Sequence, residues 1–195
     1  MSTNAFLAGD TMGMQSQDGL SHMKLGIAIS IPDPLGALLT EWRVKVGDPL
    51  AHLIPPHVTL LPPTDVGRAQ LDEVHLHLSA VAARHSPFQL HLAGTGSFRP
   101  ISEVVFVTVA EGISSCELLA QDIRSGLLAR PLDYPYHPHV TIAHDVAPDM
   151  LDLAYQSLVD VDVRLEVDAF CAFSRDLSGR WVPATEYPLL GGRDG

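Results

Sequence analysis

A short pattern occurs twice in this chain, and its repetition constrains the fold more than any other feature. Residues 56–61 read Pro-His-Val-Thr-Leu-Leu, and residues 138–143 read Pro-His-Val-Thr-Ile-Ala. In a β-strand, residues i and i+2 lie on one face and residue i+1 lies on the other. Each His-Val-Thr triplet therefore projects a histidine and a threonine from one face and turns its valine toward the core.

The surroundings of the two triplets repeat as well. Each triplet is preceded by a strand pattern and a helical pattern, and is followed by another helical pattern and strand pattern. The last strand patterns align without gaps, so that Phe98 corresponds to Phe173. The sequence therefore predicts two related units at about residues 24–98 and 103–173.

Two such units predict an α+β fold that is duplicated and bilobal. We expect two lobes related by pseudo-twofold symmetry, with mainly antiparallel sheets covered by helices and a central cleft carrying both His-x-Thr motifs. The single bilobal domain is expected at residues 23–189, with a closing strand at about 180–188. Residues 1–22 are expected to form a disordered tail and residues 190–195 a flexible C-terminus.

Pseudo-symmetry brings the four polar residues of the triplets together in that cleft. An imidazole has a reference pKa near 6.5, so two of them can supply a base and an acid in one step. His57 and His139 are therefore the predicted catalytic residues. The hydroxyls of Thr59 and Thr141 are predicted to hold phosphate oxygens between the imidazoles. This arrangement needs no metal ion, and we expect no cofactor.

These residues resemble the 2H phosphoesterases, the superfamily that includes 2′-5′ RNA ligases and cyclic phosphodiesterases. The resemblance rests on the two His-Val-Thr triplets and the duplicated units, and it covers residues 24–189. It implies metal-independent chemistry on 2′,3′-cyclic or 2′-5′ phosphodiester bonds, with the two histidines as the acid/base pair. Better-known bacterial members often have an arginine shortly after the second motif, where this chain has His144.

From these residues we predict an enzyme that hydrolyses a 2′,3′-cyclic phosphate or related phosphodiester of a nucleotide or RNA end. Two alternatives use the same cleft. One is a protein that binds a nucleotide or phosphometabolite without catalysis. The other is a 2′-5′ oligonucleotide phosphodiesterase or RNA ligase-like enzyme.

Composition limits the partners. The formal net charge is −11, and affinity for long nucleic acids comes largely from Lys and Arg contacts to phosphates. We therefore expect a small nucleotide, a cyclic phosphate or an RNA end as substrate, and no long nucleic acid. No apolar run approaches the roughly 20 residues that a membrane helix needs. A cytoplasmic monomer that keeps Cys116 and Cys171 reduced is expected.

Five further residues are candidates for the site. Tyr134 and Tyr136 precede the second motif and could stack on a base, or they could simply pack a proline-rich loop. Arg99 and Arg175 follow the two aligned strands and could contact a phosphate, or form surface salt bridges. His144 follows the second motif and could tune His139, or be an exposed histidine.

Overall fold

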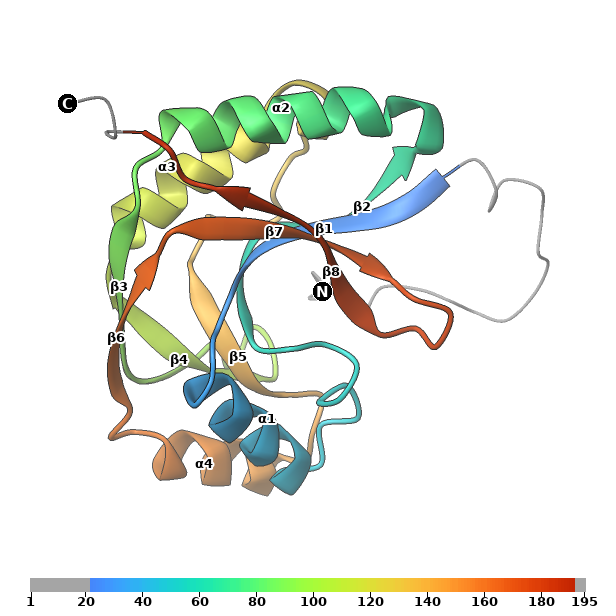
Figure 1. Cartoon of the computed structure of the whole chain (residues 1–195). Helices are drawn as coiled ribbons and strands as arrows, with labels where there is room; N and C mark the ends of the chain where they lie inside the picture. The colour runs from blue at the N-terminus through green and yellow to red at the C-terminus, as the bar shows by residue number, and fades with distance from the viewer. Residues whose placement is uncertain (1–21, 192–195) are drawn as a thin grey trace.

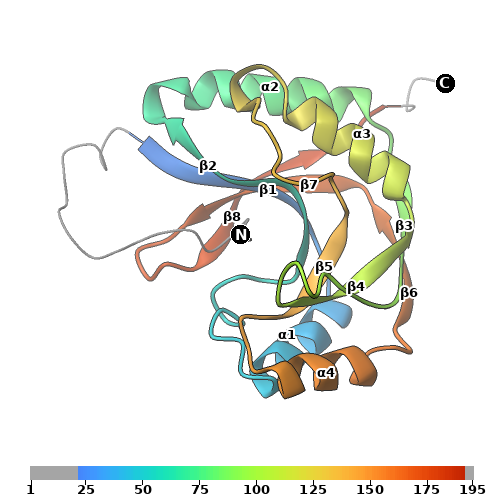
Figure 2. The ribbon, with the colours of Figure 1, turned by 180° about the vertical axis from the view of Figure 1, so that it is seen from behind.

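The computed structural model describes residues 22–191, and its strands form one strongly curled antiparallel sheet (Figures 1 and 2). The strand order is β6-β3-β4-β5-β2-β1-β7-β8. The expected α+β class and mainly antiparallel pairing are confirmed. Most of the expected N-terminal tail, residues 1–21, lies outside the described residues, whereas His22 already belongs to the first strand. The end of the C-terminus, residues 192–195, also lies outside them.

The helices and strands lie close to the positions expected from the sequence patterns. The helices are α1 (Leu35–Lys45), α2 (Leu71–Arg84), α3 (Ile113–Ile123) and α4 (Pro148–Ser157). The strands are β1 (His22–Ser30), β2 (His57–Gly67), β3 (Phe88–Ser97), β4 (Val104–Glu111), β5 (His139–His144), β6 (Asp162–Val167), β7 (Ala169–Arg175) and β8 (Trp181–Pro188). The last strand pattern of the second unit, residues 163–173, was expected to form one strand but divides into β6 and β7. It divides because β6 pairs with β3, whereas β7 pairs with β1 and β8 in the other half of the sheet.

The two halves of the sheet exchange strands between the expected sequence units. One half contains β1 and β2 of the first unit together with β7 and β8. The other half contains β4, β5 and β6 of the second unit together with β3 of the first. Each unit therefore contributes its last strand, β3 or β7, to the half that holds the other unit's triplet. The duplication itself stays a prediction, but the exchange ties both units into one folding unit.

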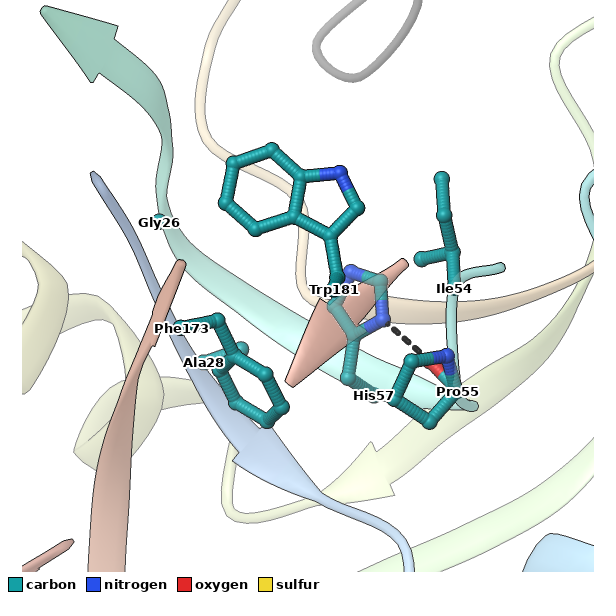
Figure 3. Close-up of a pocket in the computed structure, with 7 residues that line it drawn as sticks. All are labelled: Gly26, Ala28, Ile54, Pro55, His57, Phe173 and Trp181. Carbon is teal, nitrogen blue, oxygen red and sulfur yellow. Dashed lines mark hydrogen bonds between the residues drawn. The ribbon is translucent and has the colours of Figure 1, made fainter. Parts of the chain in front are cut away.

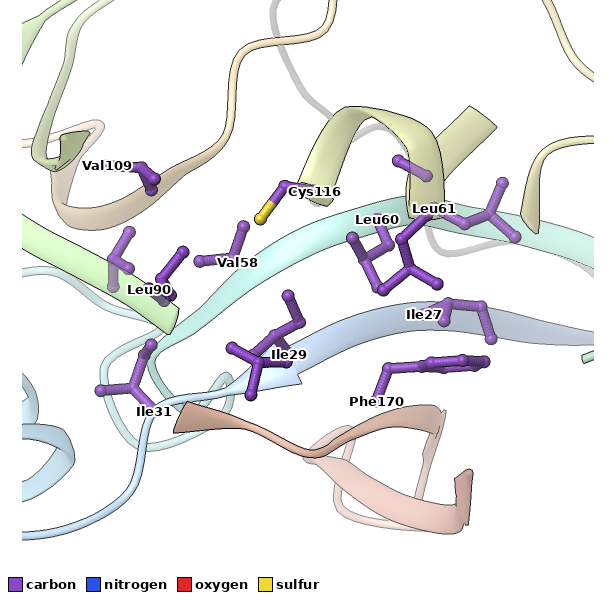
Figure 4. Packing of buried hydrophobic residues seen from close by; sticks show 14 of the residues in the cluster. Ile27, Ile29, Ile31, Val58, Leu60, Leu61, Leu90, Val109, Cys116 and Phe170 are labelled. Atoms are coloured by element: carbon purple, nitrogen blue, oxygen red, sulfur yellow. The ribbon is translucent and has the colours of Figure 1, made fainter. Parts of the chain in front are cut away.

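The helices pack against one face of the curled sheet and bury one large core with it. In both views α2 and α3 lie side by side, and α1 and α4 lie at the opposite end (Figures 1 and 2). The core includes Val58 of the first triplet together with Leu60, Ile29 and Cys116 (Figure 4). Burying such side chains is the main stabilising term of the fold. The buried residues of β2 and β5 hold these two strands in place, and their polar faces are turned away from the core.

None of the helices between residues 22 and 191 has the length and apolar composition to cross a membrane. Both cysteines lie in this range, and both are buried free thiols.

Candidate active site

The two triplets meet where the halves of the sheet join. β2 and β5 are antiparallel and pair at Val58 and Val140, and both valines are fully buried. Extending this register by one residue in each direction places His57 beside Thr141, and Thr59 beside His139. All four polar side chains line one cleft. The structure thus brings together the four residues that were predicted from the sequence.

The cleft has a volume of about 920 Å³, which lies in the range of sites for small ligands. Its charge is opposite to that of the whole chain. The sequence has 12 Lys and Arg residues against 23 Asp and Glu residues. Among residues 22–191, only two acidic residues line the cleft, Asp48 and Asp133, whereas five basic residues do: Lys24, Arg43, Arg124, Arg130 and Arg175. The net charge of −11 therefore does not describe the surface that a ligand meets.

Each histidine is held by the backbone two residues before it. His57 Nδ1 lies 2.7 Å from the Pro55 carbonyl oxygen (Figure 3), and His139 Nδ1 lies 2.7 Å from the His137 carbonyl oxygen. A carbonyl oxygen only accepts, so Nδ1 must carry the proton in both rings. Nε2 is then the basic atom of each neutral ring. The Thr59 hydroxyl lies 3.1 Å from His57 Nε2 and can donate to it.

Burial lowers the pKa of both histidines. Desolvation is the largest cause at His57, where the charges of Arg43 and His139 lower the pKa further, to about 4. Desolvation also lowers the pKa of His139 to about 4, with a smaller contribution from His137. The hydrogen bonds to the carbonyls oppose these shifts without cancelling them. Both rings are therefore neutral in the free protein at neutral pH.

Aromatic side chains lie against both histidines, and two of them lie on or next to the exchanged strands. Phe98, the residue after β3, packs edge-on against His139, with ring centroids 4.9 Å apart. Phe173 of β7 lines a small pocket together with His57 and Trp181 (Figure 3). Phe98 and Phe173 are the two residues that correspond in the sequence alignment. Each unit thus provides an apolar neighbour for the histidine of the other unit.

Arg43, which the sequence analysis did not single out, anchors the loop before His57. Its side chain is buried on α1, where Nε donates to the Asp48 carboxylate at 2.8 Å and Nη1 donates to the Ile54 carbonyl. The Asp48 carboxylate also accepts from the Leu50 backbone N–H at 2.8 Å. The loop held in this way ends at Pro55, whose carbonyl orients His57. Nothing in the local sequence separates Arg43 from an ordinary charge near a helix end.

The five additional candidates occupy different places. Tyr134, Arg175 and His144 line the cleft. Tyr136 also lines it, but its hydroxyl donates to the Thr59 carbonyl at 2.8 Å and the guanidinium of Arg124 lies over its ring. Its first role is therefore to attach the preceding segment to β2.

Arg99 lies apart from the other candidates. It donates to Asp152 at 2.8 Å and is not among the residues that line the cleft. Within residues 22–191, no group of three or more His, Cys, Asp and Glu side chains is arranged to hold a metal ion.

The family model of the 2′-5′ RNA ligase superfamily matches residues 31–179, a range that includes both triplets. The chain belongs to this superfamily. The resemblance to 2H phosphoesterases is thereby confirmed. Two relatives, from Bacillus cytotoxicus and Bacillus cereus, are named as candidate phosphoesterases. Each is 33% identical over 125 residues, which span 64% of this chain and 72% of the relative.

Solved structures show the same fold. E. coli LigT without ligand is 20% identical with a TM-score of 0.64, and covers 86% of this chain and 98% of its own. The protein TT0787 of Thermus thermophilus is 26% identical with a TM-score of 0.60, and covers 87% of this chain and 100% of its own. The protein is therefore a phosphoesterase of the 2H superfamily in family and in fold.

The buried Arg43–Asp48 ion pair yields a stability prediction. Arg43→Met should lower the free energy of unfolding by about 3–5 kcal/mol, because it leaves the Asp48 carboxylate buried without its partner. The double variant Arg43→Met/Asp48→Asn should recover part of this loss. As a control, Arg84→Met breaks a pair with Asp122 whose side chains are 58% and 42% exposed and should cost less than about 1 kcal/mol. Urea unfolding measures all three; equal losses at Arg43 and Arg84 would contradict the assigned role.

Proposed function

We propose that this protein hydrolyses a 2′,3′-cyclic phosphate at the end of a nucleotide or RNA, with His57 and His139 as its acid/base pair. One observation carries the proposal. The pairing of Val58 with Val140 sets two imidazoles and two hydroxyls on the floor of a single cleft. The basic side chains around that floor favour an anionic substrate. Membership of the superfamily supports phosphoester chemistry in general, and the geometry favours this form of it.

The reaction needs one proton removed and one supplied. A neutral histidine takes a proton from water as the water oxygen attacks phosphorus. The bond from phosphorus to one ribose oxygen breaks, and the other histidine, protonated at Nε2, gives its proton to that oxygen. The product is a phosphate monoester, and proton exchange with solvent restores the starting pair. Thr59 and Thr141 donate hydrogen bonds to the non-bridging oxygens, where charge builds up in the transition state.

The environments of the two histidines differ enough to propose their roles. Arg43 places a positive charge near His57 and opposes its protonation. No arginine or lysine within residues 22–191 contributes in this way to the lowered pKa of His139. The negative charge of a bound phosphodiester raises the pKa of a nearby imidazole. We therefore assign His139 as the acid and His57 as the base.

A comparison adds support for a small nucleotide as ligand. E. coli LigT has been solved in complex with 3′-AMP; it is 20% identical to this chain with a TM-score of 0.65. A mononucleotide of this kind is compatible with the volume of the cleft.

The first test is turnover of 2′,3′-cyclic mononucleotides, which we expect to persist in EDTA because the acid/base pair is complete without an ion. His57→Ala and His139→Ala should each abolish most activity. Thr59→Val and Thr141→Val should each lower kcat by about 10- to 1,000-fold, as expected for a lost transition-state hydrogen bond. Ligand-induced stabilisation without turnover would instead favour a binding protein. Activity lost in EDTA and restored by Mg²⁺ would contradict the mechanism.

The low pKa values predict an unusual pH dependence. With the pKa of each histidine at about 4 in the free protein, the form with one neutral and one protonated ring becomes scarcer as pH rises above that value. Because kcat/KM reports the free enzyme, it should increase as pH is lowered from about 8 to about 5. The profile of kcat should fall at a higher pH, since bound phosphate raises the pKa of the acid. Steady-state rates measured across this pH range test the prediction. A kcat/KM that stays constant with pH would refute the proposed protonation states.

A substrate with a good leaving group separates the roles of the two histidines. A p-nitrophenyl phosphodiester needs little help from an acid, so His139→Ala should recover much of its lost rate on that substrate. His57→Ala should not recover, because the water still needs a base. Release of p-nitrophenolate measures both variants against the wild type. The reverse pattern would exchange the two roles, and equal failure of both variants would argue against a divided mechanism.

A further inference from the structure

One wall of the cleft is formed by residues 130–136, here named the strap, which contain no helix or strand. The strap is attached to β2 at both ends. Arg130 Nη1 donates to the Thr64 hydroxyl at 2.8 Å, and the Tyr136 hydroxyl donates to the Thr59 carbonyl at 2.8 Å. Since the later strap residue meets the earlier residue of β2, the strap runs beside β2 in the opposite direction.

The two attachments lie at the two ends of a stretch of β2 from Thr59 to Thr64, here named the track. Thr59 belongs to the reaction centre, and Thr64 follows it along β2. A strand rises about 3.3 Å per residue, so the far attachment lies up to about 16 Å from the reaction centre. Between the attachments the strap exposes two large apolar side chains, Leu132 at 40% and Tyr134 at 46%. Tyr134 lines the cleft and is therefore accessible to a ligand that extends along the track.

Positive charge lies at the far end of the track. Arg130 donates to Thr64 and to the Pro63 carbonyl through Nη1, so Nε and Nη2 have no acceptor among residues 22–191. Lys24 of β1 is paired in register with Asp65, the residue after Thr64. Its ammonium lies 3.4 Å from that carboxylate in a solvent-exposed pair. Both cations also line the cleft.

We propose that the strap and Lys24 form a subsite for the single strand that leads to the cyclic phosphate, so that the substrate is a short oligonucleotide. Tyr134 stacks on a base, and Arg130 and Lys24 contact a backbone phosphate beyond the terminal nucleotide. This rests on the proposed function and names its substrate class. The acidic exterior does not oppose it, because the phosphates meet the protein only inside the basic cleft.

Distance favours a strand over a small molecule with two phosphate groups. In a nucleotide that carries a pyrophosphate and a cyclic phosphate, a single ribose separates the two groups. The track from Thr59 to Thr64 is longer than one ribose. A cyclic phosphate of ADP-ribose therefore serves as the competing substrate in the test.

The experiment compares kcat/KM for uridine oligonucleotides, from the mononucleotide to the tetranucleotide, each ending in a 2′,3′-cyclic phosphate. We expect kcat/KM to increase about tenfold or more between the mononucleotide and the tetranucleotide, once the strand reaches the far end of the track. The ADP-ribose derivative should resemble the mononucleotide. A rate that is independent of length would overturn the proposal while leaving the proposed function intact. An ADP-ribose derivative that reacts as well as the tetranucleotide would also overturn it.

Variants test which residues cause the dependence of kcat/KM on oligonucleotide length. In Arg130→Gln and Tyr134→Ala the ratio of kcat/KM between tetranucleotide and mononucleotide should fall several-fold toward unity, whereas Arg130→Lys should keep most of it. The matched control Arg84→Gln removes an exposed arginine outside the cleft and should leave the ratio at its wild-type value. Thr64→Val removes the attachment but keeps the charge. If Thr64→Val lowers the ratio as much as Arg130→Gln does, Arg130 only holds the strap and the phosphate contact is refuted.

A binding measurement keeps the outcome clear if turnover is absent. Fluorescence anisotropy with a labelled tetranucleotide cyclic phosphate should give a Kd that weakens several-fold in Arg130→Gln and Tyr134→Ala. The slope of log Kd against log salt should also decrease by about 0.7 in Arg130→Gln, as for one lost phosphate contact with a single strand. Binding with these dependences but without turnover would reject only the hydrolase. An unchanged Kd in both variants would reject the subsite.

Discussion

The contact between Val58 and Val140 is the constraint on which the site depends. Within residues 22–191 it is the one residue pair in the register between β2 and β5, the neighbouring strands at which the two halves of the sheet join. Both valines are drawn into the core, so the residues on either side of each valine must face the cleft. Hydrophobic burial and the backbone pairing of β2 with β5 thus together fix the positions of the two imidazoles and two hydroxyls. Backbone pairing and the burial of the two valines therefore place the polar site.

The same burial sets the chemistry of the histidines. Phe98 and Phe173 approach the rings from the exchanged strands, and carbonyl groups hold Nδ1 in each case. Desolvation then keeps both rings neutral, with Nε2 able to accept a proton. An anionic ligand supplies the negative charge that stabilises an imidazolium in such a site. In the proposed mechanism, binding of the substrate therefore also raises the pKa of the histidine that acts as the acid.

Much of this could be predicted from the sequence. The periodic patterns place most helices and strands near their positions, since local periodicity reports which face is buried, but they do not separate β6 from β7. The two triplets identify His57, Thr59, His139 and Thr141 because polar pairs on otherwise apolar strands need a role. Similarity between units does not tell which strands pair, however, so the crossing of β3 and β7 was not foreseen. Arg43 and the basic lining of the cleft were missed for a related reason. Their significance comes from contacts between distant segments, whereas the net charge alone indicated only a surface unfavourable for long nucleic acids.

The exchange of β3 and β7 has a consequence for synthesis on the ribosome. A nascent chain that has emerged only as far as β5 already contains both His-x-Thr triplets. It still lacks β7, so His57 has no Phe173 beside it and β1 has an unpaired edge. Neither half of the sheet can be completed from one sequence unit, and the first half waits for the last quarter of the chain. The active centre therefore forms late, and a prematurely terminated product carries the whole motif set without an assembled cleft.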